Sequence, residues 1–236
     1  MEHQENCRVH MLGKALRSAG AELKTVGPGA GRELPETLAE CDALIVMGGT
    51  PGPSEFDKAP WLKQTHKLVK EALEKNIPYL GVCLGGQILA EAAGGKVNEA
   101  KTPEIGIHEV RVNSAGANDP LISVLNTRKE PLEAMQWHFL EVTELPPNAV
   151  TLMESDNCEV EAFRVGESAW GLQFHPEANS ESAAAWAAEP GADEDLKQHT
   201  QQTPEQLVQE VTEKDTELEE RWNTLALKWL EIAKEN

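Results

Sequence analysis

The chain has 236 residues, and its 40 acidic and 21 basic side chains give a formal net charge of −19 at pH 7. A chain of this length can bury the core of one domain. The negative charge argues against nucleic acid and anionic membrane as partners, and no apolar stretch is long enough to predict a membrane span or an export signal.

Short apolar runs alternate along the chain with segments of helical periodicity. The predicted strands cover residues 22–26, 43–47, 77–82, 108–112, 133–137, 150–153, 160–164 and 169–174. The predicted helices cover residues 10–19, 61–75, 86–93 and 120–125. Alternation of this kind is typical of α/β proteins, so we expect one domain with a wound, mainly parallel sheet flanked by helices.

The composition changes after residue 178. Residues 179–202 are rich in Ala, Ser, Glu and Gln, and the sequence E-P-G at 189–191 is a turn signal. The sequence T-P-E-Q at 203–206 then has the pattern of a helix N-terminus with a capping box. We therefore expect a long helix that begins at this point.

The apolar residues of this last segment share one broad stripe, with acidic residues on the opposite face. They are Leu207, Val211, Leu218, Trp222, Leu225 and Trp229. We expect the helix to pack back on its own domain, and a helix that docks a partner is the alternative. The chain then divides into an α/β domain, residues 1–178, and a helical extension, residues 179–236, packed on that same domain.

The cysteines are scattered, with no C-x-x-C pair, and no His cluster has metal-ligand spacing. We therefore expect a reducing cytoplasm and no metal. No P-loop or other nucleotide-binding signature is present, so we expect no cofactor. Cys7, Cys41 and Cys158 are interpreted as packing residues, and only Cys83 has a context that predicts reactivity.

Cys83 stands in the sequence G-V-C-L-G-G-Q, residues 81–87, directly after a predicted strand. Glycines two positions before and after it permit a sharp strand-to-helix elbow in which side chains would clash. The N-terminus of the following helix favours a thiolate. The Leu84 amide is placed to donate to an oxyanion, and a second donor is expected from the glycine loop at 48–52. Each such donor typically lowers the barrier by about 3 kcal/mol.

A second motif, Q-F-H-P-E at 173–177, follows the last predicted strand. His175 can take the proton of the Cys83 thiol and return it to departing ammonia. Glu177 can hold the imidazole in the useful tautomer. Each motif is a weak signal alone. Their conjunction, in the order glycine loop, Cys elbow and His-x-Glu, indicates a Cys-His-Glu triad that cleaves a glutamine or γ-glutamyl amide.

In these motifs the chain resembles the class I glutamine amidotransferases, whose elbow reads G-x-C-x-G-x-Q and whose later strand ends in H-P-E. It looks closest to the stand-alone, GMP-synthase-like members, and the resemblance runs from about residue 44 to residue 177. It implies a flavodoxin-like fold and catalytic Cys83, His175 and Glu177. It also implies two further sets of residues: Gly49 and Leu84 as the oxyanion hole, and Gly48, Gln87, Trp137 and His138 as the glutamine pocket.

Two departures from the family bear on these expectations. Phe139 and Leu140 follow Q-W-H where relatives often have Gly-Asp, so we expect a different pocket wall. The family begins with an apolar strand, whereas this chain opens with the polar sequence M-E-H-Q-E-N. We expect that strand to be missing, and the polarity of residues 1–5 argues against a stub strand formed by them. The natural protein then starts upstream, or the chain is marginally stable and prone to associate.

Three functions remain open at this point. The first is a glutaminase-type amidotransferase that supplies ammonia to a separate synthetase or acceptor subunit, because the chain has no ATP-binding signature of its own. The second is a γ-glutamyl peptidase that uses the same residues on isopeptides. The third is a catalytically idle regulatory or scaffold protein, which the complete Cys-His-Glu set argues against.

Overall fold

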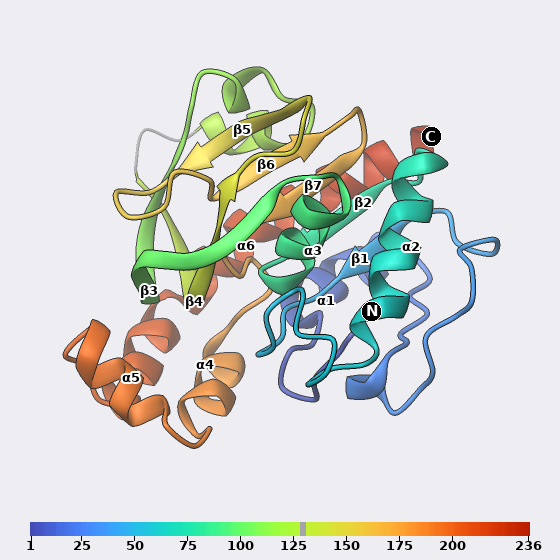
Figure 1. The fold of residues 1–236 in the computed structure, drawn as a ribbon. Helices are drawn as coiled ribbons and strands as arrows, with labels where there is room; N and C mark the ends of the chain where they lie inside the picture. Colours follow the sequence, from blue (N-terminus) through green and yellow to red (C-terminus); the bar gives the residue numbers. More distant parts are fainter. Residues whose placement is uncertain (128–130) are drawn as a thin grey trace.

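The structure is a computed structural model that describes residues 1–127 and 131–236. Its centre is a seven-stranded sheet in the order β1-β2-β7-β6-β5-β3-β4 (Figure 1). The strands are β1 Leu44–Val46, β2 Tyr79–Val82, β3 Lys96–Val112, β4 Leu132–Glu144, β5 Ala149–Glu154, β6 Ala162–Val165 and β7 Ala169–Leu172. The helices are α1 His10–Ser18, α2 Leu62–Glu74, α3 Leu84–Ala92, α4 Ser180–Ala187, α5 Ala192–His199 and α6 Pro204–Glu235, with 3-10 helices η1 Pro28–Ala30, η2 Gly116–Asn118 and η3 Ile122–Thr127.

The sheet is mixed rather than mainly parallel. The pairings β1–β2 and β2–β7 are parallel, and the other four are antiparallel. The expected α/β architecture with flanking helices is confirmed, but the expectation of a mainly parallel sheet is wrong, since four of the six strand pairings are antiparallel. The reason is that β5, β6 and β7 follow one another through short connections, which join antiparallel neighbours.

Two predicted elements differ in the structure. Residues 22–26 form no regular strand, although the carbonyl of Val26 accepts from the backbone amide of Glu2 at 2.9 Å. The helix predicted at 120–125 is the 3-10 helix η3. Both segments are short, so the tertiary contacts around them decide their conformation more than local propensity does.

The first residues of the chain lie beside β1. Met47 donates its backbone amide to the carbonyl of Met1 at 3.1 Å, while Glu2 donates on the other side to Val26. The polarity of residues 1–5 does not prevent Met1 and Glu2 from pairing with neighbouring backbone on both sides, although no strand is assigned there. The polar side chain has a partner, because the Glu2 carboxylate accepts from the backbone amide of Val9 at 3.0 Å.

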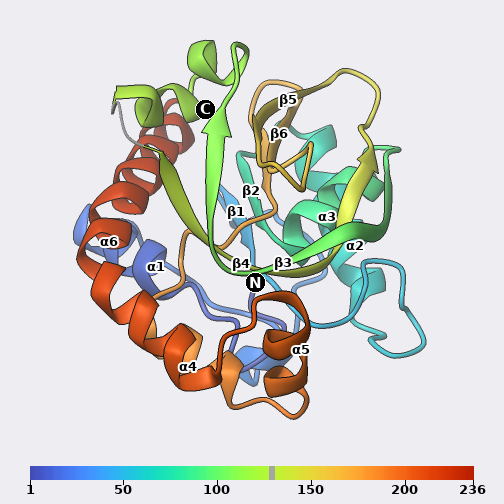
Figure 2. The ribbon, with the colours of Figure 1, turned by 90° about the vertical axis from the view of Figure 1, so that its left-hand side faces the viewer.

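The helices cover both faces of the sheet. Figure 2 shows α1 and α6 on one face, with α2 and α3 on the other. Leu80 and Val82 of β2 belong to the core under α1 and α6, whereas Tyr79 belongs to the core under α2 and α3. On α6, Trp222 lies against Phe174 with ring centroids 4.9 Å apart. The long helix thus packs against the sheet through Trp222, and it begins with the predicted capping box.

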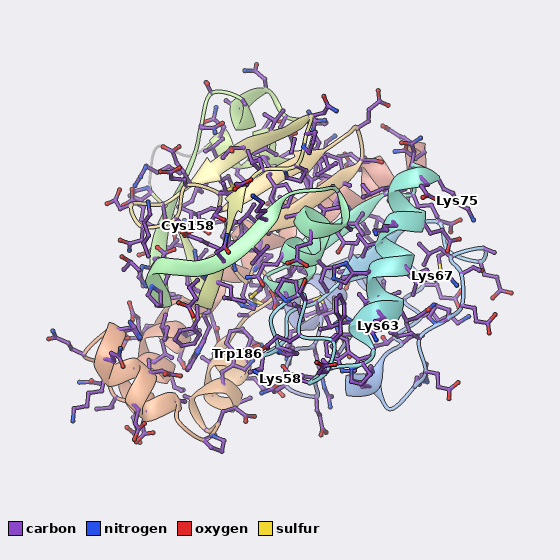
Figure 3. The ribbon with its side chains drawn as sticks, viewed as in Figure 1. Lys58, Lys63, Lys67, Lys75, Cys158 and Trp186 are labelled. Carbon is purple, nitrogen blue, oxygen red and sulfur yellow. The ribbon has the colours of Figure 1, made fainter. Side chains whose placement is uncertain are left out.

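Helix α2 shows the burial that its periodicity predicts. Leu68 and Val69 are buried against the sheet. Lys63, Lys67 and Lys75 are exposed on the opposite side of the helix (Figure 3). The segment is therefore a surface helix that covers one face of the sheet.

Helices α4 and α5 lie together beyond one end of the sheet (Figure 1). The predicted turn at 189–191 separates them. Among the helices described in residues 1–127 and 131–236, none combines the length and the apolar character needed to cross a membrane.

Candidate active site

Cys83 sits at a sharp elbow between β2 and α3. Its backbone has φ of 49° and ψ of −108°, a strained conformation for a residue other than glycine. Two hydrogen bonds hold it there: the Cys83 amide donates to the Leu172 carbonyl at 2.7 Å, and the Gln87 amide donates to the Cys83 carbonyl at 2.9 Å. The predicted elbow is present, and it places the thiol at the N-terminus of α3.

Close backbone contacts explain the glycines on both sides of this elbow. A Cβ atom added to Gly81 would lie 2.4 Å from the backbone carbon of Gly85. One added to Gly85 would lie 2.0 Å from the carbonyl oxygen of Val46 in β1, and real Cβ atoms essentially never come closer than 3.0 Å. The tight packing of α3 against β1 and β2 therefore requires glycine at both positions.

His175 and Glu177 follow β7 and form a buried pair. The His175 backbone amide donates to the Met135 carbonyl at 2.8 Å, and the ring Nδ1 lies 2.9 Å from Oε1 of Glu177. Burial alone lowers the pKa of the imidazole, but the charges of Glu177 and Cys83, with a hydrogen bond from the ring to each, raise this pKa to about 10. The arrangement therefore favours an imidazolium at neutral pH.

Cys83 and His175 line one cavity of about 270 Å³. Its other lining residues are Asn6, Cys7, Gly49, Thr50, Pro51, Gln87, Trp137, His138, Phe139, Leu140, Trp186, Glu189, Pro190, Ala192 and Asp195. The cavity thus collects residues from the N-terminal segment, the glycine loop, β4 and the C-terminal helices around the thiol of Cys83.

Three predicted site residues, Gly48, Leu84 and Glu177, lie behind the residues that line this cavity. A Cβ atom on Gly48 would lie 3.1 Å from Cε1 of His175, so this glycine lets the loop approach the ring. A Cβ atom on Gly49 would lie 2.9 Å from Cδ2 of Leu84, so the glycine loop packs against the Leu84 side chain. Glu177 holds the ring of His175 from behind.

Comparison with known proteins agrees with this geometry. The model of the class-I glutamine amidotransferase family matches residues 5–187. The chain belongs to this family. The family model ends within α4, so α5 and α6 lie beyond the matched segment.

Individual relatives give the same assignment. The glutamine amidotransferase-like protein YfeJ of Salmonella typhimurium is 30% identical over 209 residues, 83% of this chain and 82% of that protein. One subunit of the glutamine-hydrolysing GMP synthase of Pyrococcus abyssi is 32% identical over 173 residues, 72% of this chain and 83% of its own length. A crystal structure of a glutamine amidotransferase from Thermotoga maritima superposes with a TM-score of 0.82 at 28% identity, covering 98% of this chain and 96% of that one.

Trp186 is a site residue that the sequence analysis missed. Its ring lies 4.6 Å from the ring of His175, and its Nε1 donates to the Asn6 carbonyl at 2.8 Å. The side chain extends from α4 toward the body of the amidotransferase domain (Figure 3). No local signal could reveal this contact, because it depends on how α4 folds over the site.

Cys7 also lines the cavity, although it was interpreted as a packing residue. Burial, followed by the charges of Glu177 and Cys83, raises the pKa of its thiol. Cys7 is therefore a poor nucleophile despite its position. Three residues earlier, Gln4 fixes the glycine loop, because its Oε1 accepts from the backbone amide of Thr50 at 2.7 Å.

The fold also brings together Glu104, His138 and Glu161, whose side-chain ligand atoms lie within 4.8 Å of one another and could hold a metal ion. These side chains already have partners. His138 Nε2 lies 3.2 Å from Glu104, Ser155 donates to Glu104 at 2.9 Å, and Gln136 donates to Glu161 at 2.7 Å. Burial and the charge of Glu104 raise the pKa of Glu161 well above its usual range. A proton on Glu161 thus accounts for the cluster without a metal.

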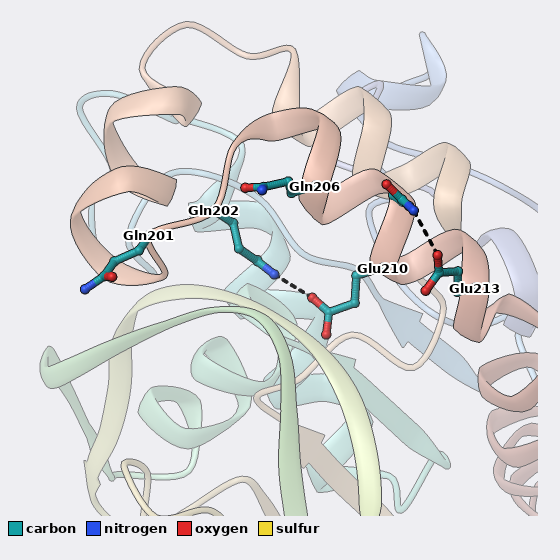
Figure 4. A pocket seen from close by; sticks show the side chains of 6 residues that line it. Gln201, Gln202, Gln206, Glu210 and Glu213 are labelled. Carbon is teal, nitrogen blue, oxygen red and sulfur yellow. Dashed lines mark hydrogen bonds between the residues drawn. The ribbon is translucent and has the colours of Figure 1, made fainter.

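A second hollow, of about 350 Å³, lies at the start of α6 (Figure 4). Only amide and carboxylate side chains line it, and two hydrogen bonds link them in pairs: Gln202 to Glu210 at 2.7 Å and Gln209 to Glu213 at 3.0 Å. None of its lining residues is a predicted site residue. We assign the chemistry to the cavity at Cys83 instead.

Proposed function

We propose that this amidotransferase domain hydrolyses a γ-glutamyl amide through a thioester on Cys83. The Cys83 sulfur attacks the amide carbon, the carbon–nitrogen bond breaks, and His175 gives its proton to the leaving ammonia. Water then attacks the thioester, and its proton passes through His175 back to the sulfur. The observation that carries the proposal is the strained Cys83 elbow in one cavity with His175, backed by Glu177.

Two backbone amides are the proposed oxyanion hole. Leu84 is the first residue of α3, so its N–H has no partner within the helix and is free to donate to a substrate. The amide of Gly49 is the second donor, and the contact between the two residues supports this pairing. The glutamine pocket is then formed by Gln87, Trp137 and His138 at the cavity wall, with Gly48 giving the loop its close approach.

The ammonia is proposed to pass to a separate synthetase subunit. Relatives named as one subunit of a glutamine-hydrolysing GMP synthase support this, since their name describes a protein divided into subunits. The catalytic thiol must stay reduced to act, and the four cysteines are free, which fits a reducing cytoplasm. Residues 1–178 are the proposed catalytic domain, and residues 179–236 the extension that closes its cavity.

A γ-glutamyl peptidase is the second candidate, and the cavity wall favours it. Phe139 lines the cavity at a position where relatives often have glycine, and its ring meets that of His199 edge-on with centroids 5.8 Å apart. An apolar wall of this kind suits a leaving group larger than ammonia.

The deciding assay offers glutamine and γ-glutamyl dipeptides side by side and measures released ammonia and amino acid, with Cys83→Ala as the control. Release of ammonia supports the amidotransferase, and release of amino acid supports the peptidase. If wild-type protein turned over neither substrate, both proposals would fail and a regulatory or scaffold role would be favoured.

A further inference from the structure

The side chain of Gln173 lies between the Cys83 sulfur and the glutamine pocket. It is 4% exposed, and its Nε2 donates to Sγ of Cys83 at 3.7 Å. Its Oε1 accepts from Nε2 of Gln87 at 3.2 Å. The two ends of this buried amide thus contact the proposed nucleophile and a residue of the proposed pocket.

The neighbouring hydrogen bonds fix which end of this amide faces the sulfur. Nε2 of Gln87 donates to the carbonyl of Leu140 at 3.1 Å, which identifies that end of Gln87 as its NH₂ group. The atom of Gln173 that faces this NH₂ group must therefore be its oxygen. The NH₂ group of Gln173 therefore faces Cys83. The reverse orientation would place the NH₂ groups of Gln173 and Gln87 against each other and would set the Gln173 oxygen against the thiolate.

The backbone holds Gln173 firmly in this place. Its own amide donates to the carbonyl of Glu161 at 2.7 Å, and two residues later His175 is held in the same way by Met135. Phe174, between them, turns away and packs against Trp222 of α6. Gln173 and His175 therefore reach the sulfur from one rigid segment, the first as a hydrogen-bond donor and the second as the acid and base.

We infer that Gln173 is a positioning residue, which aims the Cys83 sulfur and stabilises its thiolate by a hydrogen bond. This inference rests on the proposed function, but no bond to Gln173 forms or breaks in the reaction. Hydrogen bonds to charged groups are stronger than those to neutral ones, so the donor favours the thiolate over the thiol. The thiolate is the form that attacks the substrate.

The test compares Gln173→Met, which keeps the shape and loses the donor, with Gln173→Glu, which sets a carboxylate against the sulfur. The readout is the rate of iodoacetamide alkylation of Cys83 as a function of pH, located by peptide mapping. We expect the midpoint of this profile to rise by about one pH unit in Gln173→Met and further in Gln173→Glu. The matched control is Gln136→Met, which removes another buried amide, one that is bonded to Glu161. The alkylation midpoint of this control should equal that of wild type.

A wild-type midpoint in Gln173→Met would overturn the inference, as would an equal rise in the Gln136→Met control. If neither Gln173 variant folds, Gln87→Met decides, because it removes the group that orients the Gln173 amide. Its midpoint should then rise by less than one unit, and no rise would count against the inference. Alkylation needs no substrate, so this assay tests the role of Gln173 even if the wild-type protein hydrolyses no γ-glutamyl amide. That lack of hydrolysis would refute the proposed function and would leave the alkylation result to decide the role of Gln173.

Discussion

Replacing Gly85 by alanine should displace the Cys83 nucleophile, although the substitution leaves Cys83 itself unchanged. The added Cβ would lie 2.0 Å from the Val46 carbonyl oxygen, a backbone atom that cannot rotate away. Restoring a normal contact requires α3 and β1 to separate by about 1 Å, and a misplacement of this size can lower activity about 100-fold. Overpacking should also lower the free energy of unfolding by about 1–3 kcal/mol. Urea unfolding and kcat/KM for the better substrate measure the two effects.

Gly20→Ala is the matched control. Gly20 has φ of 87° and nothing within 4 Å of an added Cβ, so the substitution strains the backbone at a loop far along the chain from the site residues. We expect a similar loss of stability, about 1–2 kcal/mol, with wild-type kcat/KM per folded molecule. The reasoning is refuted if Gly85→Ala keeps wild-type kcat/KM, or if Gly20→Ala loses as much activity as Gly85→Ala.

Three further predictions concern the chemistry of the cavity. Glu177→Gln removes a charge that raises the pKa of His175. Wild-type activity should be lost as His175 deprotonates near pH 10, and in the variant this loss should occur at a pH about 1–3 units lower. An unchanged alkaline limb of the kcat profile would speak against the His175–Glu177 pair. Iodoacetamide should label Cys83 faster than Cys7, whose thiol is held protonated, and equal labelling at neutral pH excludes an activated nucleophile. Phe139→Gly should improve glutamine hydrolysis relative to a γ-glutamyl dipeptide, and unchanged selectivity removes the idea that this wall selects the substrate.

The sequence predicted the fold where local pattern determines structure. The apolar runs around β1, β2 and β7 mark a buried strand in each case, and the periodicity of α2 and α6 marks the faces that they bury. Strand direction leaves no such local mark, because parallel and antiparallel strands bury similar residues. The expectation of a mainly parallel sheet is therefore wrong at the four antiparallel pairings.

The site shows the same division. Cys83 and His175 were predictable because they lie shortly after β2 and β7, with glycines two positions from Cys83 and a proline next to His175. Trp186 and Gln173 were not, because their roles depend on contacts across the fold that spacing does not encode. The sequence likewise cannot show that the carboxylate of Glu2 has a backbone partner, the amide of Val9.

The central claim is that Cys83 carries the acyl group, and trapping that group tests it most directly. Wild-type protein is mixed with glutamine or a γ-glutamyl dipeptide, quenched in acid before the first turnover ends, and mapped by mass spectrometry of its peptides. The account predicts a γ-glutamyl adduct on the peptide that contains Cys83, and neither adduct nor turnover in Cys83→Ala. Turnover by Cys83→Ala at the wild-type rate, or an adduct on the Cys7 peptide instead, would contradict it.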